Sequence, residues 1–271
     1  MKSIAELIAE TQLKANAEPL TNEQLQEKQV KWLNDCVGDM NLRDGVECDK
    51  CKNKGVLFFV VNGELKSREC SCMKKRRTLR RAFESGLYDV LSEYTFPKYI
   101  ATEEWQKDIK DKAMLFCKDE SAKWFYIGGQ SGIGKSHLCT AIAGYYIKQG
   151  KDVRYMLWRD DVVKLKQLAN DYSGSQALMQ PFKDVDVLYI DDMFKSQSGA
   201  EPTRADINIA FEILDARLRS KDKITIISSE FTINEAMAFD EAVVGRVYQK
   251  CGIYKIDIAK DKNKNYRLKG G

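Results

Sequence analysis

The sequence predicts an α/β fold in which a parallel sheet carries helices on both faces. Helical stretches separate most of the five apolar runs that read as buried strands, at 123–127, 153–157, 186–190, 223–228 and 253–258. Such alternation is typical of a doubly wound sheet with right-handed crossovers. A glycine-rich loop follows the first strand and two aspartates follow the third, at the sheet edge where such folds bind ligands.

The glycine-rich loop fits the phosphate-binding pattern G-x-x-x-x-G-K-[ST] from Gly129 to Ser136. A strand enters this loop and a helix leaves it, so backbone N–H groups point at an anion. We expect Lys135 to reach the β- and γ-phosphates of a nucleotide and Ser136 to hold Mg²⁺. The expected nucleotide-binding residues are Gly129, Gln130, Ser131, Gly132, Ile133, Gly134, Lys135, Ser136 and His137. For His137, packing of the first helical turn is the simpler interpretation.

The strand at 186–190 ends in Asp191 and Asp192, the pattern of a Walker B strand. A buried strand would deliver Asp191 to the carboxyl edge of the sheet, within reach of Mg²⁺. Asp192 would then orient the attacking water. The alternative is an acidic helix cap after a strand, which the phosphate loop upstream makes less favoured.

Two further positions are candidates for catalysis. Ser229 or Glu230, after the fourth strand, is placed to sense the γ-phosphate, and Ser229 is our candidate. Arg246 follows an apolar helical stretch and would supply charge to the ATP of a neighbouring subunit. A surface arginine with a packed stem is the alternative for Arg246.

Composition limits the function classes. The 271 residues carry 44 basic and 40 acidic side chains, a net charge of +4 that is too balanced to indicate nucleic-acid binding by itself. No apolar run is long enough to span a membrane, and the N-terminus lacks a signal-peptide core. We therefore expect a cytoplasmic protein without a membrane partner.

Four of the eight cysteines are paired in the spacing C-x₂-C-x₁₈-C-x-C: Cys48, Cys51, Cys70 and Cys72. Between the pairs, an apolar strand at 56–61, the turn Asn62-Gly63 and a second strand near 65–69 predict a hairpin. The hairpin would bring the four thiolates together around structural Zn²⁺, as in a zinc ribbon. Reduced cysteines without metal are the alternative.

The sequence pattern also predicts how the chain is divided on either side of this cysteine module. Residues 1–45 are expected to form a helical segment, with one helix in residues 3–15 and a second that begins at a capping box, Thr21 to Gln24. Residues 46–75 form the zinc-ribbon-like module and residues 76–100 a linker helix. Residues 101–271 form the ATPase domain. Six of the eight residues at 74–81 are basic, and contact with DNA phosphates and a solvated linker helix are equally favoured for them.

Together these motifs resemble the DnaC/DnaI family of bacterial and phage helicase loaders, within the AAA+ ATPases and related to IstB. The resemblance covers roughly residues 45–271. It rests on the phosphate loop with Lys135-Ser136-His137-Leu138, the cysteine module, Ile227-Ser228-Ser229-Glu230, Gly245-Arg246-Val247 and Asn265-Tyr266-Arg267-Leu268. Too few residues follow Glu230 for the helical lid of many AAA+ proteins, which agrees with the lidless members of this clade.

The resemblance implies an ATP-hydrolysing oligomer that places a replicative helicase on single-stranded DNA and grips it through the N-terminal module. ATP sites would lie between subunits, with Arg246 as the finger in trans and Arg267 as a second sensor. The cofactors implied are ATP, Mg²⁺ at Ser136 and Asp191, and Zn²⁺ at the four cysteines. An IstB-like transposition helper and a non-catalytic adaptor switched by ATP are the alternatives.

Overall fold

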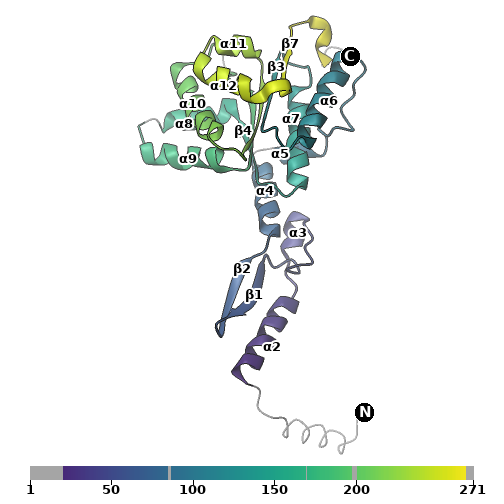
Figure 1. Cartoon of the computed structure of the whole chain (residues 1–271), viewed down its shortest axis with the longest axis vertical. Coiled ribbons are helices and arrows are strands. Elements are labelled where there is room, and N and C mark those ends of the chain that lie inside the picture. Colours follow the sequence, from purple (N-terminus) through teal and green to yellow (C-terminus); the bar gives the residue numbers. More distant parts are fainter. Residues whose placement is uncertain (1–20, 85–86, 169, 197–199, 267–271) are drawn as a thin grey trace, which may run out of the picture. The chain divides into compact units, whose positions relative to one another are not determined.

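A computed structural model describes residues 21–84, 87–168, 170–196 and 200–266 of the chain (Figure 1). The chain divides into two compact units, the first up to Met73 and the second from Lys74 onward. The expected helix at residues 3–15 lies outside the described residues. Among those described, no helix combines the length and apolar character needed to cross a membrane.

The first unit pairs a helix with a hairpin. It contains α2 (Asn22–Asp35), α3 (Met40–Asp44) and the antiparallel strands β1 (Val56–Val61) and β2 (Glu64–Glu69). The predicted capping box is confirmed, since the side chains of Thr21 and Gln24 each bond the other's backbone N–H. The predicted hairpin is confirmed as well. Its turn residues, Asn62 at φ 51° and Gly63 at φ 74°, have the left-handed backbone that a two-residue turn requires.

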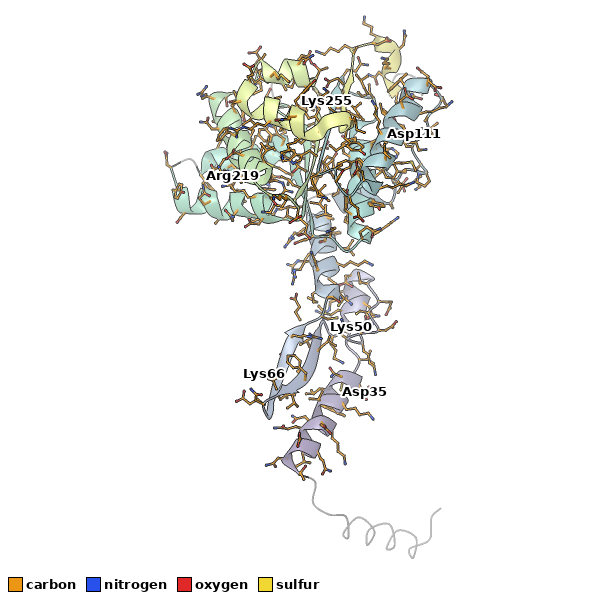
Figure 2. All side chains as sticks on the ribbon, in the orientation of Figure 1. Asp35, Lys50, Lys66, Asp111, Arg219 and Lys255 are labelled. Carbon is orange, nitrogen blue, oxygen red and sulfur yellow. The ribbon has the colours of Figure 1, made fainter. Side chains whose placement is uncertain are left out.

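The Asn34 side chain ties α2 to the hairpin. Its amide donates to the Phe58 carbonyl at 2.9 Å and accepts from the Phe58 N–H at 3.0 Å, so it extends the hydrogen bonding of β1. β2 is exposed along its whole length, and its Lys66 is visible in Figure 2. Within residues 21–73 little apolar core is buried, which makes a stabilising metal more important to this unit.

The second unit is the predicted parallel sheet, in the order β4-β5-β6-β3-β7. Its strands are β3 (Trp124–Gly129), β4 (Val153–Leu157), β5 (Val187–Met193), β6 (Ile224–Ser229) and β7 (Lys255–Ile258). Its helices are α4 (Cys72–Glu84, which begins in the first unit), α5 (Leu87–Leu91), α6 (Glu104–Lys118), α7 (Lys135–Lys148), α8 (Trp158–Gln167), α9 (Tyr172–Asp184), α10 (Arg204–Leu218), α11 (Ile233–Met237) and α12 (Glu241–Cys251), with the 3₁₀ turns η1 (Gly252–Tyr254) and η2 (Lys262–Lys264). All five predicted strands are present, and β5 runs on through both aspartates.

Helices cover both faces of this sheet because neighbouring strand residues point to opposite sides. On one face Phe125 and Ile127 pack with residues of α6 and α7 such as Phe116 and Ile142. On the other face Trp124 and Tyr126 pack with residues of α8, α9, α10 and α12. Two separate apolar cores therefore hold the sheet, as the doubly wound prediction requires.

Part of the basic run at 74–81 serves to fasten α4 to the edge of the sheet. Lys74 pairs with Asp186 at 2.5 Å, Arg81 pairs with Asp152 at 2.6 Å, and the Thr78 hydroxyl donates to the same Asp152 carboxylate at 2.8 Å. Thr78 is also fully buried. The solvated linker helix expected as the alternative to DNA contact is therefore wrong for these residues, because Thr78 is buried and Lys74 and Arg81 are paired with carboxylates of the sheet edge.

Candidate nucleotide-binding site

The phosphate loop connects β3 to α7 at the carboxyl edge of the sheet. Gly134 is the N-cap of α7, with φ 87°, and a Cβ there would lie 2.7 Å from the Tyr99 ring. Only glycine satisfies both the backbone conformation and the space at that position. The loop residues predicted from Gly129 to Ser136 thus stand where a strand, a turn and a helix N-terminus meet.

The Lys135 side chain lies buried within the phosphate loop. Its ammonium donates to the carbonyls of Gly129 and Gln130, at 2.8 Å each, and the residue is only 5% exposed. Burial lowers the pKa of Lys135, which nearby carboxylates oppose. The ammonium therefore lies within the turn of backbone that would surround a phosphate.

The Asp191 carboxylate accepts hydrogen bonds from hydroxyl groups of α7, of its own strand β5 and of the neighbouring strands β4 and β6. The Ser136 hydroxyl donates to its carboxylate at 3.0 Å, which joins the two residues predicted to hold Mg²⁺. Tyr155 of β4 donates at 3.0 Å, Tyr189 of β5 at 2.7 Å and Ser228 of β6 at 2.5 Å. Four donors on one buried carboxylate fix its orientation, as outer partners do for metal ligands.

The surroundings keep the two tyrosine donors, Tyr155 and Tyr189, protonated. Burial raises the pKa of Tyr155 and Tyr189, and the Asp191 carboxylate raises both further. Both tyrosines therefore stay protonated and donate to Asp191. Sequence reasoning missed Tyr155 and Tyr189, although both stand near the carboxyl ends of adjacent parallel strands.

Asp192 has an unusual backbone and two partners. Its φ of 52° lies in the left-handed region, and its N–H donates to the Ser228 hydroxyl at 2.9 Å. Its carboxylate pairs with Lys195 at 2.9 Å, and Lys195 also pairs with Glu230 at 2.7 Å. Sequence reasoning also missed Lys195, which the turn after β5 returns to the site.

The two serines at the end of β6 have different surroundings. Ser229 is fully buried, and its hydroxyl donates to the Met193 carbonyl at 2.8 Å. The neighbouring Ser228 is the hydroxyl that contacts Asp191 and Asp192. The prediction that Ser229 senses the γ-phosphate stays a prediction, and Ser228 is the serine that the fold brings to the aspartates.

His137 packs among aromatic rings, the simpler of its two interpretations. Its ring stacks on Tyr94 with centroids 4.9 Å apart and meets Tyr99 edge-on at 5.2 Å. Its Nε2 lies 2.8 Å from the Thr95 carbonyl oxygen. Burial lowers the pKa of His137, so the neutral ring is favoured.

Arg246 lies on α12 and pairs with Asp215 of α10 at 2.9 Å. Its side chain is 57% exposed, so it is also accessible from outside the chain. Arg267, the other arginine expected to act on ATP, lies outside the described residues.

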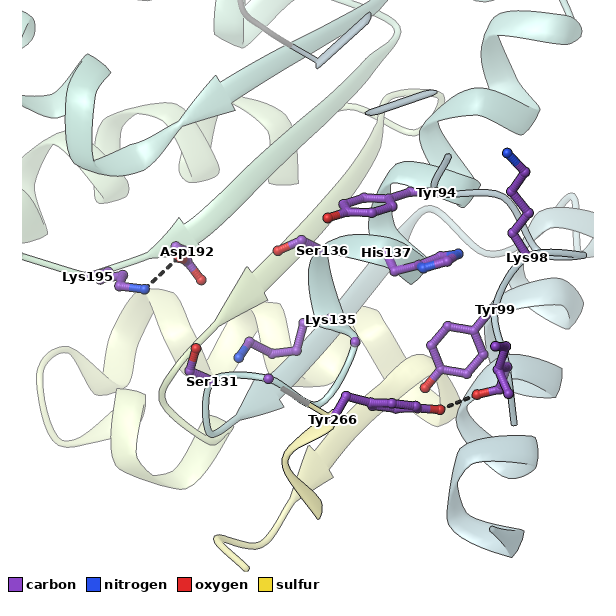
Figure 3. A pocket seen from close by; sticks show the side chains of 13 residues that line it. Tyr94, Lys98, Tyr99, Ser131, Lys135, Ser136, His137, Asp192, Lys195 and Tyr266 are labelled. Atoms are coloured by element: carbon purple, nitrogen blue, oxygen red, sulfur yellow. Dashed lines mark hydrogen bonds and ion pairs between the residues drawn. The ribbon is translucent and has the colours of Figure 1, made fainter. Parts of the chain in front are cut away.

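A cavity of about 340 Å³ lies over the loop (Figure 3). Its walls include Lys135, Ser136 and Asp192 on one side and the rings of Tyr94 and Tyr99 on the other. The segment after β7 reaches the loop itself, since the Tyr266 N–H donates to the Gly132 carbonyl at 2.8 Å. The size is within the range of small-ligand sites, with Lys135 and Lys195 at one end and aromatic rings beside Lys98 at the other.

Residues 46–270 match the sequence profile of the family described as IstB-like ATP binding protein. The chain belongs to this family. The membership agrees with the loop, the two aspartates and the sheet around them. The second unit is accordingly an AAA+ ATPase domain of the IstB/DnaC type.

Within and beyond this family, the chain is similar to two curated proteins and to one solved structure. The chain is 30% identical to the phage-like element PBSX protein XkdC of Bacillus subtilis over 83% of its own length and 87% of that protein. It is 27% identical to the replicative helicase loader DnaC of Buchnera aphidicola subsp. Schizaphis graminum, over 60% of this chain and 65% of that one. The AMPPCP-bound DnaA of Aquifex aeolicus shares its fold, with a TM-score of 0.51 at 21% identity over 65% of this chain. The chain spans about half of that DnaA, 53% of its length.

The IstB-like match begins at residue 46 and so includes the four-cysteine cluster. The sulfur atoms of Cys48, Cys51, Cys70 and Cys72 all lie within 4.8 Å of one another. Cys48 and Cys70 are 3.8 Å apart and Cys51 and Cys72 are 3.6 Å apart. Four sulfurs at about 2.3 Å from a tetrahedral Zn²⁺ would be about 3.8 Å apart, so the cluster fits that ion.

The backbone supports this cluster. The Gly55 N–H donates to the Cys51 sulfur at 3.3 Å, which favours a thiolate there. Burial raises the pKa of Cys51, but this hydrogen bond and those from the other three cysteines outweigh it and lower the pKa to about 7. The hairpin has brought the two pairs together as predicted.

Proposed function

We propose that this chain is an ATP-dependent loader that places a replicative helicase of the DnaB type on single-stranded DNA during DNA replication, in the cytoplasm. Its family membership and its likeness to a DnaC named as a helicase loader support the proposal. The observation that carries it is the joining of an ATPase unit of this family to a separate unit with a four-cysteine cluster. A bare ATPase would not need that second unit.

Within the ATPase unit, each residue of the site receives a role in hydrolysis. Lys135 would bind the β- and γ-phosphates, while Ser136 and Asp191 would hold Mg²⁺, which neutralises phosphate charge when bound. Asp192 would orient the attacking water. The 3.0 Å hydrogen bond between Ser136 and Asp191 supports a shared ion, since both oxygens lie in one place.

The first unit would grip the helicase. Several apolar side chains of this unit are exposed, including Leu25 at 50% and Trp32 at 66% on α2. Leu25 and Trp32 are seven residues apart and so lie on one face of α2, and an exposed apolar patch marks a protein-binding surface. Zn²⁺ at the four cysteines would stabilise that unit without taking part in the chemistry.

The test is binding of the full chain to the replicative helicase from the same cell or its phage. We expect the chain to form a complex with the helicase, and Trp32→Ala to weaken the complex about tenfold or more, as hot-spot aromatics do. ATP hydrolysis by Trp32→Ala should stay unchanged. Tyr172→Ala is the matched control, because Tyr172 is an aromatic residue 79% exposed in the other unit. A full chain that binds no helicase would refute the loader.

The second candidate is an IstB-like transposition helper, which the chain's membership of the IstB-like family favours. Such a helper would assemble on duplex DNA with a transposase. Failure to bind helicase, together with ATP hydrolysis stimulated by duplex DNA, would support it. The third candidate is an adaptor that binds ATP without turnover. Detection of ATP hydrolysis by the purified chain would exclude it.

A homo-oligomer with ATP sites between subunits is part of the proposal. Arg246 would then leave Asp215 and contact the ATP of the neighbouring subunit. We expect Arg246→Ala to lower hydrolysis about a hundredfold or more in the assembled state, with no change in the slow turnover of dilute monomer. Hydrolysis rates measured across protein concentrations test this. An equal loss at every concentration would contradict a role in trans.

A further inference from the structure

Lys195 is a second cation of the nucleotide site. It lines the same cavity as Lys135 and Ser136, and Figure 3 shows its ammonium directed at Asp192. It lies 2.9 Å from the Asp192 carboxylate and 2.7 Å from that of Glu230. A single ammonium thus connects the Asp192 carboxylate, near the end of β5, with the Glu230 carboxylate, which follows β6.

The backbone between Asp192 and Lys195 is shaped to make this contact. Asp192 and Phe194 both have left-handed φ angles, 52° and 68°, which non-glycine residues rarely adopt. The Lys195 N–H donates to the Asp192 carbonyl at 2.9 Å and closes a tight turn. Strained turns of this kind persist only where the surroundings enforce them, and they cluster at functional sites.

Phe194 is what enforces the turn. It is 2% exposed, and its ring packs edge-on against Trp158 at 5.5 Å and against Phe239 at 5.9 Å. With this ring anchored in the core, the turn brings the next residue, Lys195, to the cavity. The position of Lys195 is therefore set by packing and does not depend on its ion pairs alone.

The charges around Lys195 favour the ammonium form. Burial lowers its pKa, but hydrogen bonds to Glu230 and Asp192 raise it more, so that the net shift is upward. The Lys195, Asp192 and Glu230 side chains are 31%, 24% and 32% exposed, and Lys195 and Asp192 line the cavity above the loop. A charged group at this place acts on whatever occupies the cavity.

We propose that Lys195 is a positioning residue for ATP hydrolysis: its ammonium holds the Asp192 carboxylate in the orientation that directs the attacking water, and Glu230 holds the ammonium. The inference rests on the proposed role of Asp192. In the step concerned, the water oxygen forms a bond to the γ-phosphorus while the bond from that phosphorus to the bridging oxygen breaks. ADP departs with the electron pair, and the proton of the water passes through Asp192 to the phosphate formed. Lys195 exchanges no proton.

Steady-state ATP hydrolysis by the full chain, with binding of a fluorescent non-hydrolysable ATP analogue, tests the proposal. We expect Lys195→Met to lower kcat about tenfold or more, because a misplaced catalytic group costs rate out of proportion to the displacement. The KM for ATP and the Kd of the analogue should stay within about threefold of the parent chain. Lys195→Arg keeps the charge and should recover much of the lost kcat.

The chain contains a matched control. Lys164 pairs with Asp161 at 2.9 Å, also three residues apart, on the exposed surface of α8. Lys164→Met removes the same kind of ion pair away from the cavity and should leave kcat unchanged. If Lys195→Met and Lys164→Met have the same kcat, or if Lys195→Met weakens binding of the analogue as much as it lowers kcat, the proposal is wrong.

Two further variants separate this inference from the role on which it rests. Asp192→Asn should stop turnover and spare binding, and full activity in that variant would end the assigned role of Asp192. An inactive Asp192→Asn beside a fully active Lys195→Met would overturn only the role of Lys195. Glu230→Gln serves if Lys195→Met fails to fold: it retains the Lys195 side chain but removes the carboxylate that holds its ammonium, so it should lower kcat at unchanged KM. A Glu230→Gln variant with the parent kcat would count against the proposal.

Discussion

Replacing Lys135 with alanine should abolish nucleotide binding by the full chain. The ammonium lies inside the loop and bonds the Gly129 and Gln130 carbonyls, so it is already where phosphate oxygens would accept from it. Its loss removes the cation of the loop and leaves those two carbonyls facing the bound anion. We expect affinity for a fluorescent ATP analogue to fall about a hundredfold or more, since charge-assisted hydrogen bonds are the strong ones.

Lys112→Ala is the control for that measurement. Lys112 is exposed on α6 and does not line the cavity, so its removal changes net charge equally without touching the loop. Thermal unfolding of both variants shows whether the fold is kept. Unchanged ATP affinity in Lys135→Ala would remove the phosphate-loop assignment altogether.

Replacing Cys51 with serine should release zinc and unfold the first unit. Cys51 is fully buried among the other three cysteines, and a hydroxyl is a poor substitute for a zinc-binding thiolate. Metal binding at such sites supplies on the order of 10 kcal/mol of folding free energy, more than a small unit has to spare. We expect about one zinc per parent chain and close to none per variant chain, measured by elemental analysis of the purified proteins.

The same variant should still bind ATP, because the nucleotide cavity lies wholly in the second unit. Cys36→Ser is the matched control, a cysteine of the first unit outside the cluster. Cys36→Ser should keep its zinc and the protection of its first-unit backbone amides from hydrogen exchange, whereas Cys51→Ser should lose both. Zinc retained by Cys51→Ser would disprove the four-thiolate site.

Local pattern determined most of the fold and the core of the site. The apolar runs became β3 to β7, the Thr21 box capped α2, and Asn62-Gly63 turned the hairpin, because each depends on neighbours a few residues apart. The loop with Lys135 and the strand ending in Asp191 were readable for the same reason. Each is a short motif whose chemistry follows from its own spacing.

Tertiary structure decided which polar groups meet at that site. Ser228 and Ser229 are adjacent and chemically identical, so the sequence cannot distinguish them. The face that each presents depends on how β6 pairs with β5, where the register shifts between Ile190 and Met193. Tyr155 and Ser228 reach Asp191 only because β4 and β6 are the neighbours of β5 in the sheet.

The pairings of Lys195 with Glu230 and of Arg246 with Asp215 have the same origin. The partners lie 35 and 31 residues apart in the chain, on elements that only the packed sheet and helices bring within 3 Å of each other. No periodicity records such a contact, because strand order and helix packing set it. The sequence by itself therefore determined that this protein has a phosphate-binding loop, two aspartates after an apolar strand and two closely spaced pairs of cysteines. The packing of the sheet decided which side chains orient those aspartates and balance their charge.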